Sequence, residues 1–135
     1  MLAQPYFISP DGTEVTDSKT GLSWRRCSEG QTWDGNTCTG ALRVFTHERA
    51  ALYAQTQTGW RLPNVKELFS ITDLTRGNPA IDTTVFPGTP SAASWYWTLS
   101  PDAGRSGIVW MVGFSVGYVS NYHRDEPYFV RLVRE

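Results

Sequence analysis

The chain has 135 residues, which is enough for one domain with a substantial hydrophobic core but too few for two. Its formal net charge is −1, whereas proteins that bind nucleic acid without sequence preference carry a clear basic excess, so this class is excluded. No apolar run approaches the roughly 20 residues of a membrane-spanning helix, which argues against direct membrane insertion.

The residue types favour a loop-rich, aromatic-packed fold, because six Trp, six Tyr and six Phe accompany 12 Gly and 8 Pro. Residues 1–10 read as a linker or N-terminal extension, and residues 11–135 form one predicted domain. The first residues lack the basic start and apolar core of a signal peptide. We therefore expect either a cytoplasmic protein or, in preference, a piece of a longer chain.

The first predicted element is a hairpin over residues 11–24, "DGTEVTDSKTGLSW". Asp11 and Gly12 form a turn, a second turn precedes Leu22, and Val15, Leu22 and Trp24 are expected to face the core. Carboxylates at positions 11, 14 and 17 could bind calcium, but they lack the dense alternating oxygens of a strong loop site. Ordinary turns are therefore preferred.

The two cysteines, Cys27 and Cys38, flank the polar stretch "SEGQTWDGNT". A pair that closes a short polar loop predicts a disulfide, and the alternative is two reduced thiols in a cytosolic protein. Two cysteines alone cannot form a structural zinc site, and His47 and His123 lie far away in the sequence. No metal site is predicted.

Two helices are predicted in the middle of the chain. The first begins after Thr46 as cap and runs over residues 47–57, and its inward stripe is Ala50, Tyr53, Ala54 and Gln57.

The second helix follows the stretch "GWRLPNVKEL" and is predicted over residues 65–74. Asn64 and Glu67 have the spacing of a capping box, and the preceding proline favours an extended entry. Trp60, Leu62 and Leu68 are expected in the core.

The rest of the chain predicts a long ordered loop over residues 76–93 and then an antiparallel sheet. Ile81, Val85 and Phe86 are expected to pin the loop to the core. In the sheet, alternation predicts Trp110, Val112 and Phe114 inward, with Met111, Gly113 and Ser115 facing solvent. A final strand is predicted over residues 128–134. The fold class is therefore α+β, with two helices packed on small antiparallel sheets with long ordered loops.

No strong catalytic signature is present, because the chain lacks G-x-S-x-G, H-E-x-x-H and glycine-rich phosphate-loop motifs. We expect neither an enzyme nor a cofactor. Residues 94–128 instead combine aromatic, Arg and small polar side chains, which is the composition of protein-recognition surfaces.

Four segments resemble the Lcl C-terminal domain family, which occurs in bacterial surface and phage-associated proteins: "VTDSKTGLSW", "GWRLPNVKEL", "PAIDTTVFPGTPSAASWYWTLSP" and "YFVRLVR". They cover residues 11–134 in order. "WRLP" before a helix is also similar to C-type lectin folds of the formylglycine-generating-enzyme type. The resemblance implies a C-type lectin-like fold and a location outside the cell, at a bacterial surface or in a phage.

The segment over residues 96–134 resembles the variable ends of proteins diversified by retroelements. In that group, frame residues alternate with substituted positions. The frame here would be Tyr96, Trp97, Ser100, Trp110, Val112, Phe114, Gly117, Val119 and Val130 to Arg134. "TLS" replaces the usual serine run, and Val109 stands where Ala is common.

The resemblance implies a ligand-binding domain with a diversifiable surface, whose partner is a protein or glycan on another cell or surface. The alternative is a glycan-binding adhesin module. An oxidase-like enzyme is disfavoured, because both cysteines lie in the early loop. The expected ligand-binding residues are Leu99, Arg105, Met111, Tyr118, Ser120, Asn121, Tyr122, His123, Asp125, Glu126 and Tyr128.

Overall fold

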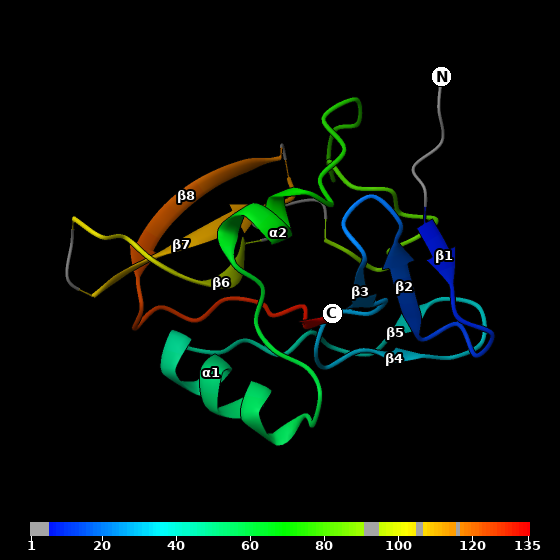
Figure 1. Cartoon of the computed structure of the whole chain (residues 1–135), viewed down its shortest axis with the longest axis horizontal. Coiled ribbons are helices and arrows are strands. Elements are labelled where there is room, and N and C mark those ends of the chain that lie inside the picture. Colours follow the sequence, from blue (N-terminus) through cyan, green and yellow to red (C-terminus); the bar gives the residue numbers. More distant parts are fainter. Residues whose placement is uncertain (1–5, 91–94, 105–106, 116) are drawn as a thin grey trace.

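The computed structural model describes residues 6–90, 95–104, 107–115 and 117–135. It has the predicted α+β architecture, with two helices and several small antiparallel sheets (Figure 1). The helices are α1 (His47–Thr56) and α2 (Val65–Phe69). The strands are β1 (Tyr6–Ile8), β2 (Glu14–Asp17), β3 (Leu22–Arg25), β4 (Thr32–Trp33), β5 (Cys38–Thr39), β6 (Trp95–Pro101), β7 (Ile108–Gly113), β8 (Tyr118–His123) and β9 (Val133–Arg134).

The predicted N-terminal hairpin is confirmed as β2 and β3, which pair antiparallel with Val15 opposite Trp24. Both side chains are fully buried, and Leu22 is buried beside them. Asp17 shapes the turn, because its carboxylate accepts the Lys19 N–H at 2.9 Å. Strands β1 and β9 extend the hairpin to a four-stranded sheet in the order β1-β2-β3-β9.

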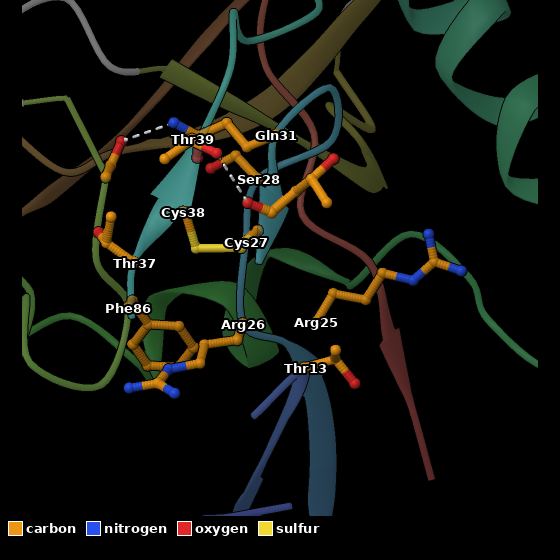
Figure 2. The surroundings of a disulfide bond; sticks show 12 residues. Thr13, Arg25, Arg26, Cys27, Ser28, Gln31, Thr37, Cys38, Thr39 and Phe86 are labelled. Carbon is orange, nitrogen blue, oxygen red and sulfur yellow. Dashed lines mark hydrogen bonds between the residues drawn. A yellow bond between two sulfur atoms is a disulfide. The ribbon is translucent and has the colours of Figure 1, made fainter. Parts of the chain in front are cut away.

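The predicted disulfide between Cys27 and Cys38 is also present, with Cα atoms 5.5 Å apart. Figure 2 shows how it ties the segment after β3 to β5. The β4–β5 turn is closed by Asp34, whose carboxylate accepts the N–H groups of Asn36 and Thr37, both at 2.8 Å. Cross-linking a loop of this length stabilises a fold by about 3 kcal/mol in the chain-entropy treatment.

Helix α1 begins where the sequence predicts, and the Thr46 hydroxyl accepts the Arg49 N–H at its N-terminus. Its buried face consists of His47, Ala50 and Ala54. The histidine was not among the residues expected on this face.

Helix α2 has the predicted capping box: the Asn64 side chain accepts the Glu67 N–H at 2.7 Å, and Glu67 accepts the Asn64 N–H at 2.8 Å. The prediction that the helix continues to residue 74 is wrong, because it ends at Phe69. The hydroxyls of Ser70 and Thr72 bond carbonyls three residues back, and the backbone tightens into short turns.

The entry to α2 is fixed by Arg61, which donates two 2.8 Å bonds to the Glu67 carboxylate. These bonds lower the pKa of Glu67. Leu62 and Leu68 are buried as predicted. Trp60 is only half-buried, contrary to the prediction, and the guanidinium groups of Arg25 and Arg134 lie 4.9 and 5.2 Å from its ring centroid.

The β6-β7-β8 sheet is covered on both faces, because α2 and α1 lie on opposite sides of it (Figure 1). Val112 and Phe114 join the core cluster that contains Leu68. Met111 joins the second cluster, which contains the buried alanines of α1, and is 0% exposed. The prediction that Met111 and Gly113 face solvent is therefore wrong, because Gly113 is buried as well. Alternation identifies the two faces of a strand but not how many of them are covered.

The C-terminal segment, residues 128–133, runs through the middle of the molecule rather than along a sheet surface. Its backbone hydrogen bonds reach Phe45, Trp95, Trp97, Glu29, Arg25 and Arg61. The predicted strand is reduced to β9, and residues 130–133 are all buried. Side chains on both sides of this segment are therefore part of the core.

Arg131 is the fully buried charge of this segment. Its guanidinium donates to the carbonyls of Arg25 and Arg26 at 3.1 and 2.6 Å, and to the hydroxyls of Ser28 and Thr89 at 3.2 and 2.9 Å. Burial lowers the pKa of Arg131. An arginine nevertheless stays protonated in proteins, so these four acceptors hold a positive charge inside the core.

The long loop is ordered over its described part, residues 76–90, and Ile81 and Phe86 are fully buried as predicted. Residues 91–93 of the predicted loop lie outside the described residues. Arg26 anchors the loop by donating to the carbonyls of Thr84 and Val85, both at 2.9 Å. Figure 2 shows the Arg26 side chain extending from beside the disulfide toward Phe86.

Replacing Leu68 with Ala should lower the free energy of unfolding by roughly 2–5 kcal/mol, because a fully buried side chain leaves a cavity. Asn64→Ala removes a helix cap and should cost about 1 kcal/mol. Urea denaturation of both variants measures the two effects. A neutral Leu68→Ala would contradict the packing described here.

Replacing Arg131 with Met should destabilise the fold by about 3 kcal/mol or more, because four buried acceptors lose a charged donor. Arg134→Met is the matched control: its partly exposed guanidinium pairs with Glu14, and such a pair contributes about 1 kcal/mol or less. Chemical denaturation compares the two variants. Equal losses of unfolding free energy in the two variants would show that the buried hydrogen-bond network contributes no more than an exposed ion pair.

Candidate functional site

A cleft of about 560 Å³ lies where the end of β6, the start of β7, the start of α1 and the turn after β8 meet. Its walls combine apolar side chains with one cation and one anion. Its lining includes His47, Leu99, Asp102, Ile108, Val109 and Arg124. Such a mixture of apolar surface and a few polar groups is typical of ligand sites.

His47 is the first residue of α1 and is 8% exposed. Its Nε2 lies 2.9 Å from the Thr98 carbonyl oxygen. A carbonyl only accepts, so Nε2 carries the proton and Nδ1 is a bare acceptor, without a hydrogen-bond partner among the described residues. Burial lowers the pKa of His47, and the nearby charge of Arg124 lowers it further. The ring is therefore neutral at pH 7.

Asp102 ties the cleft wall to β8, because its carboxylate accepts the Asn121 amide at 2.7 Å and the Gly104 N–H at 3.0 Å. Arg124 is held by its backbone, which donates to the Gly107 carbonyl and accepts from the His47 N–H. Its side chain is exposed and forms no ion pair within the described part of the chain. The cleft thus presents a cation on a rigid frame.

The structure brings several of the predicted binding residues to this end of the molecule. Leu99 lines the cleft and is 47% exposed. His123, Asp125 and Glu126 are exposed on the turn around Arg124, where the Glu126 N–H bonds the His123 carbonyl at 3.2 Å. Ser120 and Asn121 are half-buried on β8, next to this turn.

Other predicted binding residues are not placed at the cleft. Met111 is buried, as described above. Tyr128 is half-buried, and its ring packs 5.4 Å from that of Trp97. Arg105 and the side chains of Tyr118 and Tyr122 lie outside the described residues.

Sequence reasoning missed the contribution of His47 and Asp102 to the cleft. A signal existed for His47, because the Thr46 cap places the next residue at the start of a helix. Nothing in the spacing, however, shows that this position lies beside a strand that begins at Trp95. The contact is purely tertiary.

Within the described ranges, no group of three or more His, Cys, Asp or Glu side chains is arranged to hold a metal ion. Two of the carboxylates considered for calcium serve local turns, since Asp11 accepts the Thr13 N–H at 3.1 Å and Asp17 accepts the Lys19 N–H at 2.9 Å, while Glu14 pairs with Arg134. No helix among the described residues has the length and apolar character needed to cross a membrane.

The comparisons with known proteins give one result for the chain as a whole. The model of the Lcl C-terminal domain family matches residues 13–134. This range spans every element from β2 to β9, and so includes the disulfide, the buried C-terminal segment and the cleft. No curated protein matches the chain.

The pKa of His47 predicts how stability depends on pH. The unfolded chain takes up a proton near pH 6.5 and the folded chain only at lower pH, so the free energy of unfolding should fall as pH drops below 6.5. His47→Gln should reduce the loss of Tm between about pH 7.5 and about pH 5.5. The exposed His123→Gln is the control and should behave as wild type. An unchanged pH dependence in His47→Gln would refute the assignment.

Proposed function

Because the chain belongs to the Lcl C-terminal domain family, we propose that it is a non-enzymatic ligand-binding domain that acts outside the cell. Its binding surface comprises the cleft, the adjoining strand β8 and the turn of residues 123–126. The disulfide between Cys27 and Cys38 supports the extracellular location, because such bonds persist in oxidising compartments.

The observation that carries the proposal is how burial divides the residues of the C-terminal third. Most positions of this chain that match the frame of the diversified proteins are in the core. Tyr96, Trp97, Val112 and Phe114, for example, are each 0% exposed. The interspersed positions at the surface are Leu99, Ser120, Asn121, His123, Asp125 and Glu126. Three further interspersed positions, Thr98, Met111 and Gly113, are buried and are exceptions to this division.

This division separates stability from recognition. The core positions hold the fold through packing and the Arg131 network, so they tolerate little change. Exposed substitutions usually change the free energy of unfolding by no more than about 0.5 kcal/mol, whereas side chains that anchor a partner contribute about 2 kcal/mol or more of binding. Side chains at this surface can therefore vary for binding without loss of the fold.

The test is a display library in which Leu99, His123, Asp125 and Glu126 are randomised together. Selection on yeast against two unrelated proteins, lysozyme and streptavidin, should yield binders that melt close to wild type. A control library randomises four residues that are equally exposed on other parts of the chain: Phe7, Lys19, Val44 and Leu52. It should fold but yield few binders or none.

Equal recovery of binders from the two libraries would refute a surface dedicated to binding. Loss of folding in the first library would show that its four residues are needed for the fold rather than for binding. A glycan array separates the adhesin alternative. If the wild-type chain binds glycans there, and Arg124→Ala or Leu99→Ala abolishes the signal, the cleft is a glycan site instead.

A further inference from the structure

Strand β8 is one of the two outer strands of the β6-β7-β8 sheet, and no strand among the described residues pairs with its far side (Figure 1). In an antiparallel pair, residues whose backbone groups bond the neighbour alternate with residues whose groups point away. The Arg124 N–H bonds the Gly107 carbonyl, one position beyond the Ile108–His123 pair. In this register, the N–H and C=O groups of Val119 and Asn121 point away from β7.

These outward groups are unpaired in the described part of the chain, since no hydrogen bond joins the backbone of Val119 or Asn121 to another element. Val119 is also 36% exposed, and Leu74, which lies against Gly117 at the start of the strand, is 65% exposed. The edge therefore combines unpaired backbone donors and acceptors with two exposed apolar side chains, Val119 and Leu74.

The other sheet edges are short or covered. Strand β1 has three residues and is followed by Pro10, and β9 has two residues. The edge of β6 is covered by Phe129, which exchanges backbone bonds with Trp95 and Trp97, and by Pro63, which accepts the Leu99 N–H. Strand β8 has six residues, with neither Pro nor Lys to block pairing. Proteins usually protect such an edge, because it is a template for another strand.

We propose that β8 binds an extended peptide segment of a partner protein by strand addition. The occupant follows from the chemistry of the edge: regularly spaced N–H and C=O groups complement another peptide backbone, and not a sugar. An apolar side chain of the peptide would rest on Val119 and Leu74. The inference rests on the proposed ligand-binding function and specifies the class of ligand as protein.

The test uses a phage library of random 12-residue peptides selected on the immobilised wild-type chain. Selected peptides are synthesised, and their Kd is measured for wild type, Val119→Pro and Ile8→Pro. Proline at position 119 removes only an outward N–H, which an edge strand tolerates. Ile8→Pro is the matched control, because the Ser9 N–H bonds the Glu14 carbonyl and leaves the Ile8 N–H pointing outward from β1.

Val119→Pro should raise Kd by about fivefold, the effect of one lost backbone hydrogen bond, and Ile8→Pro should leave it unchanged. As a measurement that leaves the protein intact, N-methylation along the peptide should weaken binding at every second residue. The absence of selected peptides, an unchanged Kd in Val119→Pro, or sensitivity without this period would overturn the proposal.

Three further outcomes distinguish a failure of strand addition from a failure of the proposed function. Concentration-dependent dimerisation that Val119→Pro abolishes would overturn the proposal in favour of a second copy as the occupant. Binders from the library of four surface residues, without peptides at β8, would leave the proposed function standing and refute strand addition alone. Peptides at β8 with no binders from that library would support strand addition and refute the wider surface.

Discussion

The fold depends on one buried charge, the guanidinium of Arg131. It is enclosed in the core and donates to the carbonyls of Arg25 and Arg26 and to the hydroxyls of Ser28 and Thr89. These acceptors come from the segment around the disulfide and from the long loop. One side chain of the C-terminal segment therefore joins the N-terminal part of the chain to its middle. Without these acceptors, burial of the charge would cost several kcal/mol.

The same C-terminal segment explains why the β6-β7-β8 sheet is buried on both faces. It exchanges backbone bonds with Trp95, Trp97 and Phe45, and so brings the start of α1 against one face while α2 packs on the other. A sheet that is covered on both faces leaves side chains and backbone groups accessible only at its ends and at its unpaired edge. The cleft lined by Leu99 and Arg124 is at such an end, and β8 is such an edge.

The division between core and surface also explains why some of the predicted binding residues are exposed and others are buried. Positions on turns, such as His123 and Glu126, are exposed as expected, because charged turn residues have little to bury against. Met111 is buried instead, since its strand is covered on the face that alternation alone assigns to solvent. Burial thus divides the residues that the likeness to diversified proteins singles out into those that are exposed and those that belong to the core.

The order of the amino acids was sufficient to specify the local structure of this protein: the hairpin with Val15 and Trp24 inside, the capping box at Asn64 and the closure of the loop between the two cysteines. These features depend on neighbours within a few residues, and their signals lie in spacing and residue type. The burial of Arg131 and the position of His47 beside Thr98 depend instead on how distant segments pack together. Those contacts join residues dozens of positions apart, and their acceptors are largely backbone carbonyls, which every residue type provides.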